Sequence, residues 1–461
     1  MRSAGAANRP NLPAAQRLAA GKNGPAARER LWKSEYCPSN KQTGPRVPSS
    51  AVLCEMPDYL ADTTLPEAAA RVRGARAEML GRGGIAALQA RAVGAVAGIA
   101  ARVAAGEFAT DIAERDPTFR ATRLSLDALA ASCAADALWA LIDSEAVRAP
   151  AGAAGLTLHV IATNTPLLAW TSIFRALLVG SASLVRLPAA APVVEAWTRE
   201  LLAQMAAQDA ALAAMAAAVR WPSDDAQATQ AACAAADAVL AYGSDDSIEG
   251  IRALTPAGRI FAGYGRRFSL GVVLEGAPIE AAARGSALDI AIFQQQGCLS
   301  PQYLFVEEPA GAAFADALAG ALARAADLFP ARTLAEAAAI REAHALARLE
   351  PGARVLADAR LRWCVLQSRS EKLISAGQPG VVFVLPLNWE RLNRQVCLAG
   401  LSGRLQGASV AAKDAAGFET AAAALREMGA AYVCAAGQLQ RPPLSWREDG
   451  RDVLRILVQN A

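Results

Sequence analysis

Histidine and aromatic side chains are scarce in this sequence of 461 residues, which has two histidines and is only 5% aromatic. The histidines, His159 and His344, lie far apart, which argues against a histidine-rich zinc site. A serine-histidine-aspartate triad would have to use one of these two residues. We therefore expect other side chains to carry any chemistry, and alanine and aliphatic residues to supply most of the apolar surface.

Paired cysteines are also missing. The eight cysteines show no CxxC spacing, which disfavours both a zinc ribbon and the disulfide framework of a secreted protein. We expect no metal site, and a reduced, cytoplasmic protein. The cysteines stand at positions 37, 54, 133, 233, 298, 364, 397 and 434.

Charge is nearly balanced, with a formal net charge of +3. Residues 1–48 hold nine basic and two acidic residues, so the remainder is net −4 and has no basic face to attract nucleic acid. Charges such as Arg91 and Arg102 interrupt the most apolar stretches, so we expect no membrane span of ~20 residues. The start has no apolar export signal and resembles a transit peptide only weakly, so we expect a disordered leader over 1–48.

The length predicts two or three domains, because single cores stop growing near ~250 to 300 residues. Residues 65–149 show a helical pattern, after which short apolar runs alternate with helical segments. This alternation predicts a doubly wound parallel sheet, which binds nucleotides at the carboxyl ends of its strands. Strands are expected at 156–162, 182–187, 238–242, 259–263 and 268–275, and helices at 167–179, 191–219 and 246–254.

A second α/β series is expected from about residue 276, with the domain boundary near residue 266. Its predicted helices are 278–293, 311–328 and 333–349, and its predicted strands are 303–307, 361–366, 381–386 and 431–435.

The sharpest local feature is the polar stretch QQQGCLSP at residues 294–301, between a predicted helix and a predicted strand. Gly297 permits close backbone approach and Pro301 stops a helix, so Cys298 should lie on a fixed turn. A thiol there acts as a nucleophile if its surroundings favour the thiolate. The alternative is a small buried apolar residue, the usual role of a free cysteine.

Asn164 follows a predicted buried strand and precedes Pro166 by two positions. Its amide could donate to a developing oxyanion, together with the backbone N–H of Cys298. The alternative is turn formation, which is typical of asparagine in such loops.

Gly243 and Ser244 stand at a strand end directly before a helix, where free N–H groups favour a phosphate. Asp245 and Asp246 oppose this, because acids in the first turn compete with a bound anion. The ordinary dinucleotide fingerprint GxGxxG is absent from the sequence.

In this order, these motifs resemble the aldehyde dehydrogenase superfamily. The resemblance is strongest to its acyl-CoA reductase family, which includes the reductase subunit of the bacterial bioluminescence fatty-acid reductase complex. It covers roughly residues 65–455 and includes the 134 positions between Asn164 and Cys298. The matching stretches are NTP at 164–166, LVRLP at 184–188, AYGSD at 241–245, GYGRRFS at 263–269, QQGCLSP at 295–301 and QRPPLSW at 440–446.

The resemblance implies two doubly wound α/β domains with a helical N-terminal preface. A nicotinamide-binding domain would span 49–265 with that preface, a catalytic thiol domain 266–435, and a C-terminal segment 436–461. Cys298 would be the nucleophile and Asn164 the oxyanion donor, and Gly243 and Ser244 would line the phosphate path. Arg186 stands where many relatives have a lysine that holds the cofactor ribose. Its fork-shaped guanidinium suits a 2′-phosphate, which favours NADPH, with NADH as the alternative.

One departure from the superfamily concerns the water-activating glutamate of aldehyde-oxidising relatives. The corresponding region here, residues 266–269, reads RRFS and has no glutamate. A thioester reductase does not need that water, so the absence favours reduction over oxidation. Glu275 is a possible substitute acid or base, although a strand-end glutamate more often faces solvent.

The resemblance therefore implies NADPH-dependent reduction of a long-chain fatty acyl-CoA to the aldehyde through an S-acyl-cysteine. The acyl group would arrive on CoA or on a partner protein, and the chain would form a homo-oligomer. Two alternatives stay open. One is an acyl-phosphate reductase or aldehyde dehydrogenase of the same superfamily, and the other is a non-catalytic acyl- or partner-binding subunit.

Overall fold

The structure, a computed structural model, describes residues 64–189, 191–330, 332–369, 379–398 and 401–459. The chain divides into two units, residues 1–48 and 49–461. The predicted leader lies outside the described residues, and all that follows concerns the second unit.

The expected helical region is confirmed. Glu67 caps the first helix by accepting hydrogen bonds from the main-chain N–H of Thr64, at 2.8 Å, and from its hydroxyl, at 2.9 Å. Gly84, with φ 71°, allows a kink inside that helix. The region comprises α2 (Leu65–Ala104), α3 (Ile112–Arg115), α4 (Phe119–Ala131) and α5 (Ala135–Ser144).

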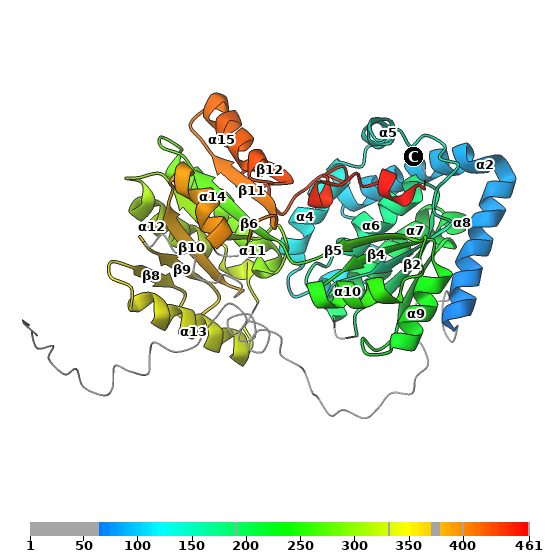
Figure 1. Ribbon diagram of the computed structural model, residues 1–461, viewed down its shortest axis with the longest axis horizontal. Helices are drawn as coiled ribbons and strands as arrows, with labels where there is room; N and C mark the ends of the chain where they lie inside the picture. Colours follow the sequence, from blue (N-terminus) through cyan, green and yellow to red (C-terminus); the bar gives the residue numbers. More distant parts are fainter. Residues whose placement is uncertain (1–63, 190, 331, 370–378, 399–400, 460–461) are drawn as a thin grey trace, which may run out of the picture. The chain divides into compact units, whose positions relative to one another are not determined.

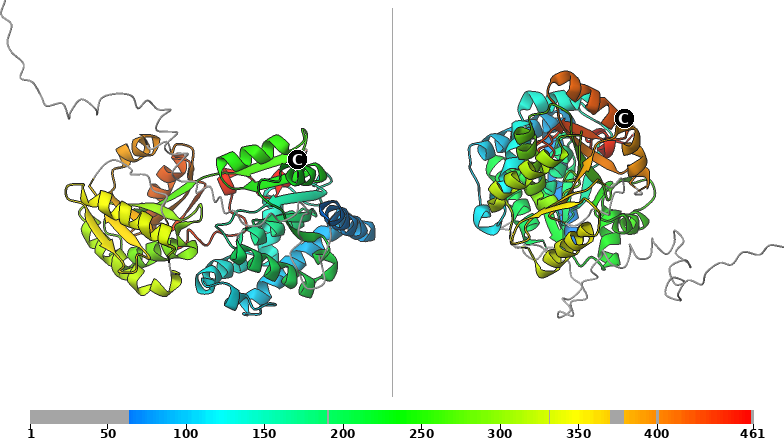
Figure 2. Two further views of the ribbon diagram at one scale, coloured as in Figure 1. Left: turned by 90° about the horizontal axis from the view of Figure 1, so that it is seen from below. Right: turned by 90° about the vertical axis from the view of Figure 1, so that its left-hand side faces the viewer.

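Helix α2 is long and apolar enough to cross a membrane by length and composition, and the bent pair α4 and α5 would be a second such segment if counted as one span. We expected no such segment from the charges in the sequence, but Arg91 is the only charged residue between Arg82 and Arg102. In the structure α2 packs against α6, α7, α9 and β2 (Figures 1 and 2). Side chains of α2 such as Val96 and Ile99 are buried in this packing.

The first sheet has five parallel strands in the order β3-β2-β1-β4-β5. Its strands are β1 (Leu156–Val160), β2 (Ala182–Leu187), β3 (Ala216–Arg220), β4 (Ala238–Tyr242) and β5 (Ile260–Tyr264). The order reverses at β1. Right-handed crossovers therefore place α6 (Leu168–Leu178) and α7 (Pro192–Gln208) on one face, and α9 (Ala226–Ala235) and α10 (Asp245–Leu254) on the other (Figure 1). The reversal between β1 and β4 is the point where such sheets bind ligands.

The prediction of a single helix over 191–219 is wrong. Helix α7 ends at Gln208, and the Asp209 side chain caps the short α8 (Ala210–Ala213) by accepting from the N–H groups of Ala211 and Leu212. Strand β3 follows and pairs with β2. The alanine-rich pattern favours a helix, but pairing with β2 and burial outweigh that local preference.

The second sheet has seven strands in the order β12-β11-β6-β7-β10-β9-β8, and every pair is parallel except β8 with β9. Its strands are β6 (Phe268–Val273), β7 (Pro301–Val306), β8 (Arg354–Ala357), β9 (Cys364–Gln367), β10 (Val381–Pro386), β11 (Leu405–Ala411) and β12 (Tyr432–Ala435). Its helices are α11 (Ile279–Ala291), α12 (Gly311–Arg324), α13 (Leu334–Arg348), α14 (Trp389–Leu398) and α15 (Ala415–Glu427). The sequence pattern missed β8, β11, α14 and α15.

Both faces of this sheet are covered by apolar side chains. Leu304 and Val306 of β7 enter one core, whereas Tyr303 and Phe305 enter the other, as the two-residue period of a strand requires. The predicted α/β architecture, with two sheets covered by helices and a helical N-terminal preface, is confirmed.

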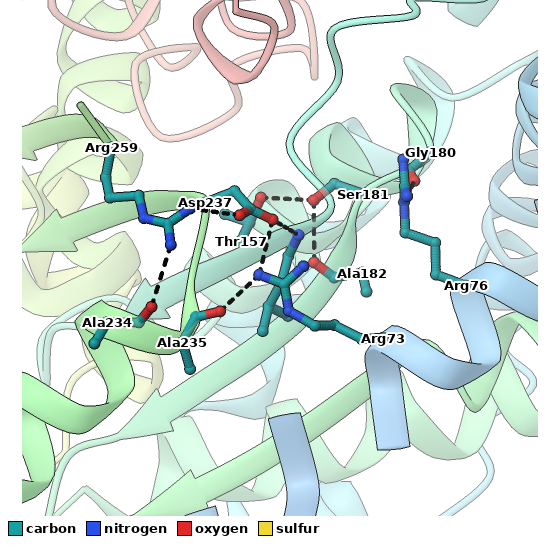
Figure 3. Close-up of polar contacts among 11 residues, drawn as sticks. Arg73, Arg76, Thr157, Gly180, Ser181, Ala182, Ala234, Ala235, Asp237 and Arg259 are labelled. Atoms are coloured by element: carbon teal, nitrogen blue, oxygen red, sulfur yellow. Dashed lines mark hydrogen bonds and ion pairs between the residues drawn. The ribbon is translucent and has the colours of Figure 1, made fainter. Parts of the chain in front are cut away.

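An arginine cluster ties α2 to the amino-terminal edge of the five-stranded sheet (Figure 3). Asp237, just before β4, pairs with Arg73 of α2 at 2.9 Å and with Arg259 at 2.8 Å, and accepts from the N–H of Leu156. Arg76 donates to the Gly180 carbonyl at 2.6 Å. These contacts lie at the edge opposite the carboxyl ends of the strands, so we assign them to anchoring the preface.

Candidate active site

Cys298 follows an unusual turn between α11 and β7. Phe293, Gln294 and Gln295 have φ of 56°, 57° and 61°, so three consecutive non-glycine residues are left-handed. Each such residue costs on the order of 1–3 kcal/mol and persists only where its surroundings impose it. The Gln295 amide supplies part of that constraint, because it donates to the carbonyls of Pro301 at 2.9 Å and Val381 at 3.0 Å.

Three neighbours at the amino-terminal edge of the seven-stranded sheet surround Cys298. The Ser269 hydroxyl, at the start of β6, donates to the Cys298 carbonyl at 2.8 Å. The same hydroxyl accepts from the N–H of Gly407 of β11 at 3.0 Å. The Gln406 side chain lies near enough to the Cys298 sulfur to lower the pKa of the thiol. The structure thus places Cys298 on a fixed turn, as the sequence predicted.

The Cys298 thiol is neutral in this environment. Burial, together with the carboxylates of Glu448 and Asp449, raises its pKa to about 12, while Gln406 acts in the opposite direction. A raised pKa does not single out Cys298, because burial also raises the pKa of Cys133 and Cys364 to about 12. Cys298 and Cys434 are partly exposed, whereas Cys133 and Cys364 are fully buried. Of these four thiols, Cys298 is the one that follows the left-handed turn held by Asn164.

The C-terminal segment, residues 436–459, carries Glu448 toward the thiol. Arg175 of α6 holds this segment by donating to the carbonyls of Leu444, at 3.2 and 3.1 Å, and Trp446, at 3.1 Å. It also pairs with Glu448 at 3.0 Å, with both side chains almost fully buried. Burial raises the pKa of Glu448, and the charge of Arg175 partly offsets this.

Arg267 forms a two-pronged ion pair with Asp449, with nitrogen–oxygen distances of 2.9 and 2.6 Å. Arg267 lies in the stretch where aldehyde-oxidising relatives have their glutamate, so a cation stands there. Sequence reasoning missed Glu448 and Asp449, although they follow the 440–446 motif directly. The adjacent acids before Gly450 were the available signal.

Asn164 lies beyond the carboxyl end of β1, and its amide donates to the Gln296 carbonyl at 2.6 Å. Gln296 is two residues before Cys298, so the structure brings these two predicted site residues together. In this arrangement the Asn164 amide braces the turn of the thiol.

Gly243 and Ser244 follow β4 at the same edge as Asn164, beside the point where the strand order reverses. Ser244 caps α10 by accepting from the N–H of Ser247 at 3.2 Å, and the Gly243 N–H donates to the Tyr264 carbonyl at 3.3 Å. Asp245 pairs with Arg404 at 2.7 Å, so its charge is partly balanced. Asp245 therefore opposes a bound anion at the start of α10 less strongly than an unpaired carboxylate would.

Arg186 lies in β2 near its carboxyl end, next to Arg220 at the end of β3. Its guanidinium stacks over the Trp221 ring, 5.7 Å from the ring centre, and donates to the Trp221 carbonyl at 3.2 Å. Burial and the charge of Arg220 lower the pKa of Arg186. Arg220 also pairs with Glu195. Arg186 and Arg220 therefore place two cations at this edge of the sheet. The sequence motifs indicated only Arg186.

The remaining candidates lie away from the thiol. Glu275 is exposed beyond the carboxyl end of β6, whereas Cys298 lies at the amino-terminal edge of that sheet. His159 is fully buried between the hydroxyls of Ser172, at 2.6 Å, and Ser183, at 3.1 Å, and burial lowers its pKa to about 3. Within the described part of the chain, no group of histidine, cysteine and acidic side chains is arranged to hold a metal ion.

Comparisons with known proteins show the family of the chain. A family model described as acyl-CoA reductase (LuxC) matches residues 118–460. A long-chain acyl-protein thioester reductase of Aliivibrio fischeri is 30% identical over 152 residues, 33% of this chain and 32% of that protein. A second such reductase, from Photobacterium leiognathi, is 28% identical over 176 residues, 38% of this chain and 37% of that protein. The matches thus span about a third of the length of these relatives.

Solved structures give the same fold. The putative aldehyde dehydrogenase PutA of Anabaena variabilis has a TM-score of 0.59 and 18% identity, covering 83% of this chain and 86% of that one. A glyceraldehyde-3-phosphate dehydrogenase of Methanocaldococcus jannaschii, solved with NADP, has a TM-score of 0.59 and 13% identity, covering 81% and 85%. The chain has the aldehyde dehydrogenase fold and belongs to the acyl-CoA reductase (LuxC) family.

Proposed function

We propose that this protein reduces a long-chain fatty acyl thioester to the aldehyde through an S-acyl intermediate on Cys298. The observation that carries the proposal is the strained turn that presents a partly exposed thiol, braced by Asn164. Family membership and the names of the relatives support the same chemistry.

The acyl-transfer step uses the residues of this turn. The Cys298 thiolate attacks the thioester carbonyl carbon, a new carbon–sulfur bond forms, and the bond to the carrier sulfur breaks. The carrier leaves as a thiol with the proton that Cys298 gave up. Asn164 donates to the oxyanion after its amide turns away from the Gln296 carbonyl, its partner in the resting state.

A nicotinamide cofactor would supply the hydride that converts the S-acyl group to the aldehyde. The residues present fit such a group, because the strand order reverses beside Gly243 and Ser244 and a helix starts there. Arg186 and Arg220 supply two cations for a 2′-phosphate, so we propose NADPH rather than NADH.

Charge around the thiol favours reduction over oxidation. Oxidation would need a free carboxylate to activate water against the S-acyl group. Here Glu448 is paired with Arg175 and Asp449 with Arg267. Neither carboxylate is a free base, so the S-acyl group is protected from hydrolysis until hydride arrives.

The acyl donor is either CoA or an acylated partner protein, and the relatives' names favour the protein. Cytoplasmic location and a homo-oligomer are further proposals. An acyl-phosphate reductase, an aldehyde dehydrogenase and a non-catalytic acyl- or partner-binding subunit are the alternatives. Product analysis with acyl-CoA, acyl-protein and acyl phosphate distinguishes the enzymes.

The deciding experiment is peptide mass spectrometry after mixing the protein with a long-chain acyl-CoA. We expect the acyl mass on the peptide that contains Cys298, its loss with release of aldehyde on adding NADPH, and neither result in Cys298→Ala. Cys434→Ala, at a partly buried free cysteine, is the matched control. Wild-type aldehyde formation by Cys298→Ala would refute the proposal, and binding without acylation would favour the non-catalytic subunit.

A further inference from the structure

Gln406 occupies an irregular position in β11. In the pairing of β11 with β6, Leu405 is opposite Phe268 and Gly407 is opposite Ser269, so Gln406 is an extra residue without a partner. Such a bulge changes the direction of a side chain and is common beside active sites. The irregularity occurs at the amino-terminal edge of the sheet, where Cys298 lies.

The Gln406 side chain is nearly fully buried, with 2% of its surface exposed. Its neighbour Gly407 donates to the Ser269 hydroxyl at 3.0 Å, and that hydroxyl donates to the Cys298 carbonyl at 2.8 Å, so the bulge lies beside the residue that carries the thiol. The Gln406 amide lowers the pKa of that thiol, and its Oε1 atom has no hydrogen-bond partner among the described residues. A buried amide oxygen without a partner costs about 1–3 kcal/mol, so this amide is not optimised for stability. The bulge therefore places an amide with an unsatisfied oxygen beside the Cys298 sulfur.

We propose that Gln406 donates an amide hydrogen bond to the Cys298 sulfur and thereby stabilises the thiolate that attacks the acyl group. This inference rests on the proposed role of Cys298 as the nucleophile. A carboxamide suits the position, because its N–H donates to a thiolate, and its oxygen accepts from the neutral thiol if the group turns over.

The charges around the sulfur show why a donor is needed there. Glu448 and Asp449 both disfavour the thiolate, as does burial. Arg267, which favours it, is committed to Asp449. Gln406 adds a donor without adding a charge, so it favours the thiolate without a further ion pair.

The test is the pH dependence of alkylation of Cys298 by iodoacetamide, followed on the Cys298 peptide by mass spectrometry in the full chain. Gln406→Leu removes the donor, and we expect ~10-fold slower alkylation at pH 8 because hydrogen bonds to charged groups are strong. Gln406→Glu keeps the shape but adds a negative charge, so we expect a larger loss. Gln89→Leu is the matched control, since Gln89 of α2 is equally buried but bonds the carbonyls of Val147 and of Leu178 in α6.

Unchanged alkylation profiles in folded Gln406→Leu and Gln406→Glu would overturn the inference, and so would an equal change in Gln89→Leu. Alkylation needs neither acyl donor nor NADPH, so its result is independent of turnover. If the variants shift alkylation but the wild-type protein forms no aldehyde, only the proposed function fails. If aldehyde forms and alkylation is unaffected, only this inference fails.

Discussion

Asn164 donates its amide N–H to the main-chain carbonyl of Gln296 at 2.6 Å. A residue beyond the first strand of the five-stranded sheet therefore holds the turn that carries Cys298 in the seven-stranded domain. This bond gives Asn164 a bracing role in the resting protein, besides its proposed role at the oxyanion.

Replacing Asn164 tests its proposed role at the oxyanion, and the same change also removes the bond to Gln296. Asn164→Ala should lower the rate of S-acylation by ~10² to 10³, because one oxyanion donor is lost. Stopped-flow acylation of Cys298 measures this, and Thr163→Ala, at the exposed neighbour, is the control. If Asn164→Ala acylates at the wild-type rate, the amide does not act on the oxyanion.

The ion pair of Arg267 with Asp449 should affect how readily the Cys298 thiol is alkylated. Asp449→Asn removes an anion that disfavours the Cys298 thiolate, so iodoacetamide should react about tenfold faster at pH 8, equivalent to one pKa unit. Arg267→Gln leaves that anion uncompensated and should slow the reaction by a similar factor. The double variant should fall between the two.

The exposed pair Arg148 with Asp143 supplies the control for this cycle. Asp143→Asn should leave alkylation of Cys298 unchanged. Faster alkylation in Arg267→Gln would contradict the sign of the argument.

Arg186 and Arg220 should determine the choice of cofactor. Arg186→Gln and Arg220→Gln should each reduce the preference for NADPH over NADH by ~10-fold, because each removes a cation from the proposed 2′-phosphate site. The ratio of kcat/KM for the two cofactors is the measurement. Arg199→Gln, which also loses a bond to Glu195, is the control. An unchanged ratio in both variants would place the 2′-phosphate elsewhere.

The buried His159 should make the free energy of unfolding depend on pH. Its pKa is about 3 in the folded protein against 6.5 as the ordinary value, so the unfolded chain binds the extra proton between these limits. This contribution is complete above pH 6.5 and is lost as the pH falls toward 3, by at most ~1.4 kcal/mol per pH unit. Urea unfolding at pH 7, 6 and 5 should show a smaller slope in His159→Gln. Equal slopes would show that His159 does not carry this dependence.

Local sequence patterns predicted much of the fold. Apolar runs such as 182–187, 238–242 and 381–386 became strands with those bounds, because a buried strand needs continuous apolar side chains. The alanine tract misled the pattern at β3, since alanine favours a helix and pairing with β2 is not visible along the chain.

In the candidate site, too, local sequence predicted some features, and others depended on contacts between distant segments. Gly297 and Pro301 predicted the turn of Cys298 from a few neighbouring residues. Glu448 and Gln406 could not be found in this way, because their contacts with the thiol join segments more than 100 positions apart in sequence.

The sequence by itself determined the alternation of strands and helices in the two α/β sheets, the turn that carries Cys298 and the absence of a glutamate at 266–269, because each depends on local pattern or residue type. The tertiary structure decided which charges and donors surround that thiol. A bulge in β11 and the C-terminal segment bring Gln406, Glu448 and Asp449 to one sulfur, and the state of a thiol depends on the charges around it rather than on its neighbours along the chain.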